Sequence, residues 1–481
     1  MTEYKPTDHP TALKDAAEIL RRGGLVAFPT ETVYGLGADA MNADACRRIY
    51  TAKGRPGDNP LIIHISDMEM LSLAVADKDE VERAKPLIDA FWPGPLTLIF
   101  KKSGLINEAV NGGQATVAVR MPGNAIALAL IEEAGIPIAA PSANLSGRPS
   151  PTTAAHVQED LDGRIDMILD GGPADVGLES TIVDMSTPTP TLLRPGYITL
   201  EMLEELLGPV SVACELTLSD SEAPKAPGMK YKHYAPNAKL TLVKAKRAVR
   251  AAKYIREKIK GSPQKTAVIA PETLLSKYRG LNTYTLTAKN LFSALRKLDE
   301  DGVEQAFVHP PEETGIGRAL LNRLTKASGG NIIDLDTVLF VCTGNTCRSP
   351  MAEAVWENFN TGCRAKSRGI AVMPGGAINE NSAKALEGLG LSLNGHIPSP
   401  LTDSDIEEAS VILTMTKAHA EHIKQRAANH SSKVFTLAKY AGLDEDVPDP
   451  FGADLAVYKH CAETIEKLIS KIIENRAVRA Y

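Results

Sequence analysis

A cysteine and an arginine frame the most specific motif of the chain, Cys342-Thr343-Gly344-Asn345-Thr346-Cys347-Arg348-Ser349-Pro350. It follows the apolar run Val338–Val341 and precedes an amphipathic stretch, so we expect a loop between a strand and a helix, with Ser349 as N-cap. Such a loop directs backbone N–H groups and the helix dipole at one point, which suits a phosphate. Arg348 adds a planar fork for phosphate oxygens, and positive surroundings favour the thiolate of Cys342. The pattern predicts phosphate binding and a cysteine nucleophile.

A phosphocysteine mechanism also needs an acid that protonates the leaving group. Asp449 is our candidate because Pro448 and Pro450 fix its backbone, and its rivals are Asp444, Glu445 and Asp446. Cys347 lies close enough in sequence to form a reversible disulfide with Cys342 under oxidation, and its alternative role is loop packing.

Residues 336–475 resemble the low-molecular-weight protein tyrosine phosphatase family, in the phosphate loop Val338–Glu353 and in Asp449-Pro450. Within that family, Thr346, Cys347 and Phe451-Gly452 resemble the bacterial protein arginine phosphatases. The resemblance implies a protein phosphatase that prefers phosphoarginine and uses Cys342, Arg348 and Asp449, with Thr343, Gly344, Asn345, Thr346, Cys347 and Ser349 around the phosphate. Phosphotyrosine is the alternative substrate, and an inactive phosphate-binding or redox-sensing domain is the alternative class.

Polar and basic residues also follow several strands of the first part of the chain, at Pro29–Leu36, Lys53-Gly54-Arg55-Pro56, Asn59-Pro60 and Ser142-Ala143-Asn144. Lys53 and Arg55, held by Gly and Pro, suit a triphosphate, although a solvated turn explains either residue alone. The first part of the chain has no Walker loop, no Gly-x-Gly-x-x-Gly and no metal-spaced set of cysteines and histidines.

Taken together, these segments resemble the threonylcarbamoyl-AMP synthase family over residues 10–333, with further matches at Leu178–Val183, Leu193–Gly196 and Ala226–Pro236. The last segment is typical of the longer, two-domain form. The resemblance implies that L-threonine, bicarbonate and ATP give L-threonylcarbamoyl-AMP and pyrophosphate, for threonylcarbamoyladenosine modification of tRNA by a downstream transferase machinery. It also implies Mg²⁺ bound with ATP as substrate and no prosthetic group. A nucleotide- or tRNA-binding module that regulates the phosphatase is the alternative.

Site residues carry over from that family by position. The implied nucleotide contacts are Lys53, Arg55, Asn59, Thr116, Ser142, Asn144, Ser150, Arg194, His233 and Tyr234. The implied threonine contacts are Thr32, His64, Arg120, Ala140 and Ser180. Arg120 would hold the threonine carboxylate in a bidentate pair. His64 lies in an apolar run, where a lone histidine is more often a core residue.

The elements that must position these residues are those of an α/β protein. Apolar runs alternate with helical stretches, at Leu25–Phe28, Leu61–Ile65, Leu96–Phe100, Thr116–Val119, Ile136–Ala140, Thr181–Val183, Leu240–Val243, Thr266–Ile269, Ala306–Val308 and Val338–Val341. A length of 481 residues suits about three domains. We expect a mixed α/β synthase domain with a twisted sheet over 10–205, a linker or lid over 206–237, a Rossmann-like accessory domain over 238–333 and a parallel-sheet phosphatase domain over 336–481.

Composition limits the function classes further. A net charge of −6 excludes a polycation of the histone kind, so any nucleotide must be held by a local basic pocket. Six scattered cysteines suit a reducing compartment rather than a disulfide framework. The N-terminus has no apolar signal core and no run reaches membrane-spanning length, so we expect a cytoplasmic protein without a membrane partner.

Overall fold

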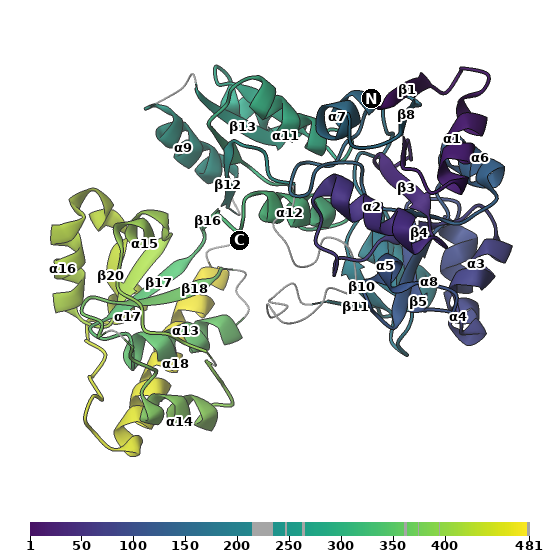
Figure 1. The fold of residues 1–481 in the computed structure, drawn as a ribbon. Coiled ribbons are helices and arrows are strands. Elements are labelled where there is room, and N and C mark those ends of the chain that lie inside the picture. Colours follow the sequence, from purple (N-terminus) through teal and green to yellow (C-terminus); the bar gives the residue numbers. More distant parts are fainter. Residues whose placement is uncertain are drawn as a thin grey trace. The chain divides into compact units, whose positions relative to one another are not determined.

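The computed structural model describes residues 1–213, 234–245, 248–261, 265–359, 363–373, 375–393 and 395–478. It divides into two compact units, the first formed by Met1–Leu242 with Ala252–Ile332 and the second by Val243–Ala251 with Ile333–Tyr481. Figure 1 labels many of the elements of both. No helix among these residues is long and apolar enough to cross a membrane.

The first part of unit 1 is built on a mixed sheet of eleven strands. In spatial order they are β1 (Glu3–Pro6), β8 (Met167–Asp170), β2 (Val26–Phe28), β3 (Gly35–Asp39), β7 (Ile138–Ala140), β4 (Ile62–His64), β6 (Thr116–Arg120), β5 (Leu96–Lys101), β9 (Thr181–Asp184), β10 (Thr191–Arg194) and β11 (Ser211–Val212). Parallel pairs such as β4 with β6 alternate with antiparallel pairs such as β3 with β7. The expected mixed α/β fold is therefore present.

Eight helices accompany this sheet within the described part of residues 1–213: α1 (Ala12–Arg21), α2 (Ala43–Lys53), α3 (Met68–Ala74), α4 (Lys78–Phe91), α5 (Glu108–Asn111), α6 (Ala125–Ala134), α7 (Ala154–Leu161) and α8 (Leu200–Leu207). Helix α2 is well delimited. The Asn42 side chain accepts from the backbone N–H groups of Asp44 and Ala45, and Gly54 ends the helix with φ of +61°. That ending places Lys53 on the last turn and Arg55 in the loop beyond it.

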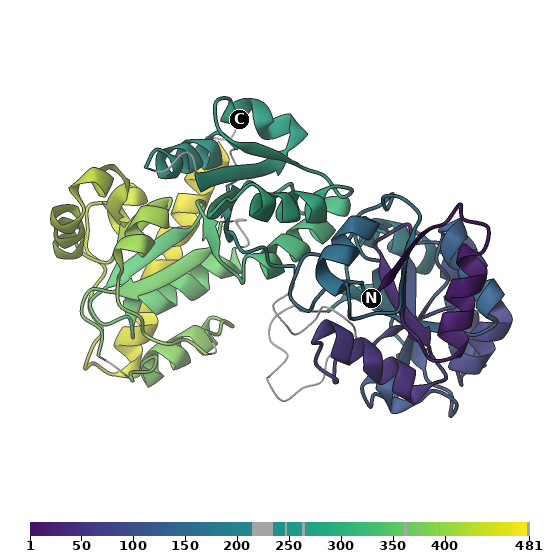
Figure 2. The same cartoon turned by 45° about the horizontal axis from the view of Figure 1, so that its top comes forward.

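A second, five-stranded sheet has the order β14 (Thr283–Leu286), β13 (Thr266–Pro271), β15 (Gln305–Val308), β12 (Lys239–Lys244) and β16 (Ile332–Asp334). The pairs that β13 makes with β14 and β15, and the pair of β12 with β15, are parallel. Its helices are α9 (Ala248–Ile259), α10 (Glu272–Leu275), α11 (Leu291–Glu300) and α12 (Ile316–Ala327), with the 3-10 turn η2 (Ser276–Tyr278), and Figure 2 shows them beside the strands. We call this part the accessory domain.

The accessory domain shares a core with the first part of unit 1. Val33, Leu178 and Tyr234 belong to the same apolar cluster as Leu240 and Phe292. Close backbone approach reinforces the contact, because a Cβ on Gly177 would lie 2.3 Å from the carbonyl oxygen of Lys289. The two parts of unit 1 are therefore packed against each other through this apolar cluster.

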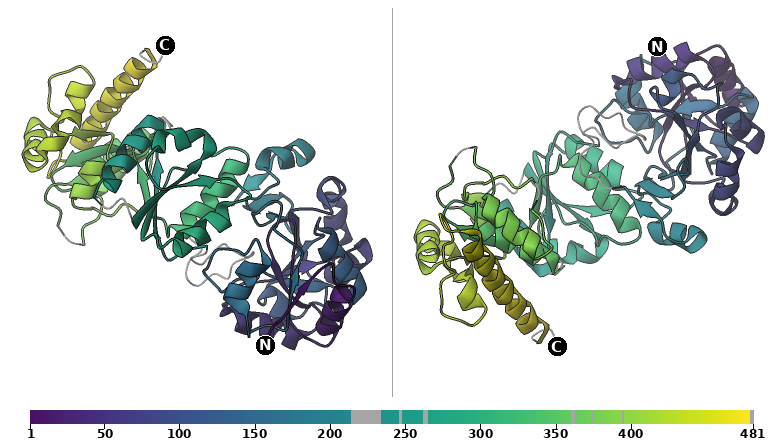
Figure 3. Two further views of the ribbon diagram at one scale, coloured as in Figure 1. Left: turned by 90° about the horizontal axis from the view of Figure 1, so that it is seen from above. Right: turned by 90° about the horizontal axis from the view of Figure 1, so that it is seen from below.

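Unit 2 contains a parallel four-stranded sheet of order β18 (Ala365–Gly369), β17 (Val338–Cys342), β19 (Val411–Thr414) and β20 (Val434–Thr436). Its helices are α13 (Arg348–Asn358), α14 (Glu380–Gly388), α15 (Asp403–Glu408), α16 (Lys417–Arg426), α17 (Leu437–Tyr440) and α18 (Leu455–Val478), with the 3-10 turn η3 (Ala428–Lys433). Helix α18, yellow in Figure 3, lies against α13 and α14. Cys342 ends the central strand β17, so the motif lies at the carboxyl edge of the sheet, as the sequence predicts.

Candidate active sites

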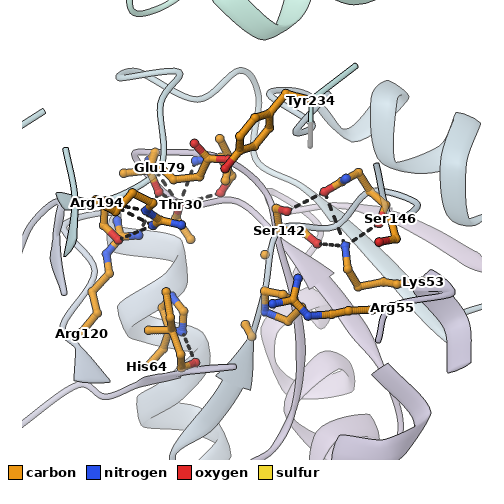
Figure 4. Close-up of a pocket in the computed structure, with 18 residues that line it drawn as sticks. Thr30, Lys53, Arg55, His64, Arg120, Ser142, Ser146, Glu179, Arg194 and Tyr234 are labelled. Carbon is orange, nitrogen blue, oxygen red and sulfur yellow. Dashed lines mark hydrogen bonds between the residues drawn. The ribbon is translucent and has the colours of Figure 1, made fainter. Parts of the chain in front are cut away.

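A pocket of about 690 Å³, its open mouth included, lies at the strand ends of the eleven-stranded sheet. Figure 4 shows Lys53, Arg55 and Ser142 on one side of it and Arg120 and Arg194 on the other. These side chains come from α2 and the loop after it, from the segment after β7, and from β6 and β10. Polar groups from distant parts of the sequence therefore converge on one concave site.

Lys53 organises one wall of the pocket. It is 2% exposed and donates to the backbone oxygens of Ser142 and Asn144, with the Asn144 Oδ1 at 3.4 Å. The Ser142 hydroxyl donates to the Asn144 Oδ1, and the Asn144 amide donates to the Leu145 and Arg148 oxygens. Burial lowers the pKa of Lys53 well below its ordinary value, and the nearby Arg55 lowers it further. The lysine thus holds the segment 142–144 in place.

Arg55 lies beside that wall. Its Nε donates to the Asn59 oxygen at 3.1 Å and its Nη2 to the Pro60 oxygen at 3.0 Å. Burial lowers its pKa to about 10, so the guanidinium stays charged at neutral pH. A fixed cation at the pocket wall suits a phosphate chain.

Arg194 and Ser180 form part of the opposite wall. The Arg194 Nε and Nη2 donate to the Ser180 oxygen at 3.2 and 3.0 Å, and Nη2 also reaches the Ser180 Oγ at 3.2 Å. The Ser180 hydroxyl is 2.6 Å from the Thr97 hydroxyl. Burial lowers the pKa of Arg194 to about 10, and it too stays charged.

The buried carboxylate of Glu179 lies next to these groups. It accepts from the Ser150 hydroxyl at 2.7 Å and from the Arg323 Nε of the accessory domain at 2.9 Å. Burial raises its pKa, but Arg323 and then Arg194 outweigh burial and bring the pKa to about 2. Glu179 is therefore a carboxylate at every physiological pH.

Arg120 lies on the same side of the pocket as Arg194 (Figure 4), and its side chain is 4% exposed. It donates to the Gly94 oxygen at 3.2 Å, to the Thr32 hydroxyl at 2.9 Å and to the Glu31 carboxylate. Burial raises the pKa of Glu31, but Arg120 outweighs burial and the net change is downward. This cation at a pocket wall suits a ligand carboxylate.

His64 ends β4 on the pocket floor and is 4% exposed. Its Nδ1 is 3.1 Å from the Ile62 oxygen, and its ring meets Phe28 edge-on at 6.0 Å between centroids. Burial, and then Arg120, lower its pKa to about 3, so the imidazole is neutral at physiological pH. A neutral ring here can contact a ligand without adding charge.

The structure brings together most of the sequence-predicted residues of the first site. Those lining the pocket are Lys53, Arg55, Ser142, Asn144, Arg194, Tyr234, Thr32, His64, Arg120, Ala140 and Ser180. Three others lie outside the lining: Ser150 behind Glu179, Asn59 behind Arg55, and Thr116 at the start of β6, where Asn111 donates to its backbone oxygen. His233, and most of the proposed lid, lie outside the described residues.

Sequence reasoning did not single out Thr30, Ser146 and Glu179, which also line the pocket, or Arg323 behind them. Thr30 and Glu179 lie in segments that resemble the family, close to Thr32 and Ser180. This closeness in sequence was the signal that could have identified them as pocket residues. Arg323 lies in an ordinary amphipathic helix, and no local signal distinguishes it.

In unit 2 the loop 342–348 curls around the Cys342 thiol, which is 3% exposed. The Asn345 N–H donates to the Cys342 Sγ at 3.3 Å, and the Ser349 Oγ lies 3.0 Å from the same sulfur. Both contacts stabilise negative charge on sulfur. Arg348 starts helix α13 and is 4% exposed.

Asn345 locks the loop in shape. Its φ of +56° is a left-handed conformation that Asn tolerates better than most residues. Its side-chain amide donates to the Ser349 and Ser367 hydroxyls at 3.0 and 2.8 Å and accepts from the Ser399 N–H at 2.9 Å. These contacts hold the loop in one shape, ready for a phosphate.

The prediction that Ser349 caps helix α13 is wrong. The helix begins two residues earlier, at Arg348, with Cys347 at the N-cap position and no side-chain cap. The Ser349 hydroxyl instead contacts the thiol and the Asn345 amide. The helix N-terminus is thereby left to a ligand rather than to a capping side chain.

Asp449 reaches the loop, with its Oδ2 2.6 Å from the Arg348 Nη2. Of its rivals, Asp444 pairs with the Lys417 ammonium at 3.0 Å, and Asp446 accepts from the Lys417 N–H at 2.8 Å. The structure therefore favours Asp449 as the carboxylate nearest the phosphate loop. The loop also contacts helix α16, because the Thr343 hydroxyl lies 2.9 Å from the Nε2 of His419.

The Cys347 side chain is buried, with 5% of its surface exposed. Its sulfur is 3.5 Å from the Thr346 hydroxyl and 3.6 Å from the Tyr458 hydroxyl. Burial, and then Cys347 itself, raise the pKa of Tyr458. Both Cys342 and Cys347 are free thiols. Among the residues that the structure describes, no group of three or more His, Cys, Asp or Glu could hold a metal ion.

Three family models match successive parts of the chain. The family model described as "Telomere recombination" matches residues 18–196, and "Threonylcarbamoyl-AMP synthase, C-terminal domain" matches 198–329. "Low molecular weight phosphotyrosine protein phosphatase" matches residues 337–479.

Individual relatives match the same parts of the chain as the family models. The threonylcarbamoyl-AMP synthase of Pyrococcus abyssi is 47% identical over 326 residues, which cover 67% of this chain and 95% of the relative. The crystal structure of P. abyssi Sua5 complexed with L-threonine has a TM-score of 0.64 and 44% identity, and the match covers 69% of this chain and 99% of that chain. The protein-arginine-phosphatase of Bacillus subtilis is 37% identical over 143 residues, 29% of this chain and 95% of the relative.

Both matched families are enzyme families, and the first uses ATP. The chain therefore belongs to the threonylcarbamoyl-AMP synthase family, and residues 337–479 add to it a low-molecular-weight phosphatase domain of the protein-arginine-phosphatase type.

Proposed function

We propose that unit 1 converts L-threonine, bicarbonate and ATP into L-threonylcarbamoyl-AMP and pyrophosphate. The observation that carries this proposal is the two-walled pocket, with Lys53 and Arg55 facing Arg120 and Arg194 across one space. The first wall suits the triphosphate, and Arg120 with Thr32 suits the carboxylate of threonine. A solved relative in complex with L-threonine supports the amino-acid half of the assignment.

In this reaction the threonine amine adds to the carbon of bicarbonate, with loss of water, to give a carbamate. A carbamate oxygen then attacks the α-phosphorus of ATP, and the bond to the pyrophosphate oxygen breaks. The residues position the two ligands and neutralise phosphate charge, and no covalent enzyme intermediate is needed. The neutral His64 at the floor adds no charge that would compete for the threonine carboxylate.

Mg²⁺ fits this pocket as a companion of ATP. The carboxylates near the pocket, Glu31 and Glu179, are already paired with Arg120 and Arg323. Phosphate oxygens and water would therefore hold the ion, and Mg²⁺ would supply charge neutralisation of the triphosphate. The activated carbamate would then serve a downstream transferase that modifies tRNA to threonylcarbamoyladenosine.

The test is direct. The full chain is mixed with ATP, Mg²⁺, L-threonine and bicarbonate, and L-threonylcarbamoyl-AMP and pyrophosphate are measured by mass spectrometry. We expect both products, and neither when threonine is omitted. Absence of the adenylate with all substrates present rules the proposal out and leaves a nucleotide-binding module as the alternative.

We propose further that unit 2 dephosphorylates proteins through Cys342. The thiolate attacks phosphorus, the bond to the leaving group breaks, and Asp449 donates the proton that the leaving group takes. Water then cleaves the phosphocysteine, with Asp449 accepting its proton. The observation that carries this step is the Cys342 sulfur held by Asn345 and Ser349, with the paired Arg348 and Asp449 beside the same loop.

We propose phosphoarginine as the substrate, supported by Thr346 in the loop and by the similar protein-arginine-phosphatase. Rates are compared on phosphoarginine and phosphotyrosine peptides, with Cys342→Ser as the inactive control. We expect faster release of phosphate from phosphoarginine, and a shift towards phosphotyrosine in Thr346→Ile. An unchanged preference in that variant removes Thr346 as the selector.

The corresponding domain boundaries that we propose are 10–205 for the synthase domain, 206–237 for the linker, 238–333 for the accessory domain and 336–481 for the phosphatase. The family models, which match residues 18–196, 198–329 and 337–479, support a division of the chain into these main parts.

A further inference from the structure

A charged pair joins the accessory domain to the wall of the synthase pocket. Arg323, on helix α12, is 0% exposed, and its Nε lies 2.9 Å from the Glu179 Oε2. The guanidinium carbon also lies 5.8 Å from the centre of the Tyr234 ring, which packs at 5.2 Å on Phe292 of α11. An arginine of one domain is therefore locked onto a residue that lines the site of the other.

Glu179 is the part of this wall whose charge needs compensation. Its other oxygen accepts from Ser150, and it stands directly before Ser180, to which Arg194 donates. A buried carboxylate without a cation would repel the phosphates of ATP and draw Arg194 towards itself. Phosphate binding by this wall therefore depends on a second cation that belongs to Glu179.

We infer that Arg323 is a positioning residue of the synthase site, which neutralises Glu179 so that this carboxylate neither repels the nucleotide phosphates nor competes with them for Arg194. This inference rests on the proposed ATP site. It gives the accessory domain a defined part in the reaction, although Arg323 itself is absent from the residues that line the pocket.

The electrostatics of the wall agree with this role. The charged and titratable groups that face Glu179 are Arg323 from α12, Arg194 from β10 and the Tyr234 phenol, whose pKa burial and then Glu179 raise to about 12. Glu179 keeps a pKa of about 2 because the two arginines outweigh its burial. Once Arg323 is removed, only Arg194 and the hydrogen bond from Ser150 remain among the stated causes that oppose burial, and the pKa of Glu179 rises.

The experiment compares Arg323→Met with Arg323→Lys and with the double variant Glu179→Gln/Arg323→Met in the full chain. We expect Arg323→Met to raise the KM for ATP at least tenfold at pH 8 and to change the KM for threonine less than threefold. Relative to the wild-type value at the same pH, the KM for ATP of this variant is expected to fall as the pH is lowered, because protonation of Glu179 removes the unpaired charge. The double variant, which buries no charge, lowers the KM for ATP at least threefold relative to Arg323→Met.

Arg256→Met is the matched control, because Arg256 donates only to the Lys277 and Arg279 oxygens of the accessory domain in the contacts that the structure gives. It reports what a loss of accessory-domain stability alone does to the KM for ATP. Should Arg323→Met fail to fold, Arg323→Lys carries the test: it keeps the cation beside Glu179, so its KM for ATP should stay within threefold of wild type, and an increase of tenfold or more would overturn the inference.

The inference is overturned if Arg323→Met keeps the wild-type KM for ATP, or if the double variant is as impaired as Arg323→Met. Production of the adenylate by the wild-type chain in the same assay separates these outcomes from a failure of the proposed function itself.

Discussion

Asp449 and the incoming phosphate require the same arginine, and this competition has a measurable consequence. The Asp449 Oδ2 lies 2.6 Å from the Arg348 Nη2, where a phosphate oxygen would otherwise bind. Asp449→Asn keeps the shape of the side chain and removes its charge and its transferable proton. The substitution should therefore improve the binding of an oxyanion while it abolishes most of the catalysis.

The structure sets the size of both effects. Asp449 is 52% exposed, so its pair with Arg348 contributes about 0.2–1 kcal/mol to stability, as half-solvated ion pairs do. Removal of that competitor should tighten vanadate or phosphate binding by up to about fivefold, since 1.4 kcal/mol corresponds to a factor of ten. Loss of the general acid should lower kcat about 10²–10⁴-fold.

The assay measures the inhibition constant of vanadate and the steady-state kcat on a phosphopeptide, for wild type and Asp449→Asn. Urea unfolding of both proteins gives the change in stability, which we expect to stay below about 1 kcal/mol. Asp444→Asn is the control, since that carboxylate pairs with Lys417 instead. Weaker vanadate binding in Asp449→Asn, or a kcat within tenfold of wild type, would refute the reasoning.

Three further predictions concern buried or strained groups. Arg120→Met leaves Glu31 as a buried carboxylate without its cation and should lower the free energy of unfolding by about 3–5 kcal/mol. Adding Glu31→Gln should restore most of the stability but not the binding of threonine. Urea unfolding measures the first effect, and the KM for threonine measures the second. Asn345→Ala keeps the φ of +56° but removes the amide contacts, and it should destabilise unit 2 by about 2 kcal/mol or more. Asn345→Gly should lose less stability, because glycine adopts this φ without strain. Equal losses of stability in thermal unfolding would contradict a role for backbone strain. His64 has a pKa of about 3 against an ordinary 6.5, so the unfolded chain binds a proton that the folded chain refuses, and stability falls as pH drops from about 6.5 towards 3. His64→Gln should remove up to about 1.4 kcal/mol of that loss per pH unit, measured by urea unfolding at pH 7 and pH 5.

The sequence predicted the strand–loop–helix arrangement around Cys342 because the motif is contiguous. Cys342 ends β17 and Arg348 begins α13, so spacing alone places the two residues at the ends of one loop. The apolar runs at β2, β4, β5, β6 and β9 also matched strands, since each is a buried run bounded by turns. Less regular strands such as β10 and β20 carry weaker patterns and were not expected.

The synthase pocket was harder to predict because its residues come from distant segments. The pairing of Arg323 with Glu179 joins positions 144 residues apart, and no periodicity in either segment indicates it. The N-cap at Ser349 was mispredicted for a related reason. The Ser349 hydroxyl contacts the thiol of Cys342 and the amide of Asn345, and sequence rules for helix caps do not consider such contacts. Local rules predict elements, whereas contacts between elements decide which polar groups remain for a ligand.

The three acceptors around Lys53 have a thermodynamic consequence for nucleotide binding. An ammonium has three N–H groups, and the oxygens of Ser142 and Asn144 engage them before any ligand arrives. The segment 142–144 is thus ordered during folding, and the loss of backbone entropy, about 1–2 kcal/mol per residue, does not recur on association. Calorimetry of Lys53→Met should therefore show ATP binding with a more unfavourable entropy, so that this lysine acts on affinity through the rigidity of the empty site.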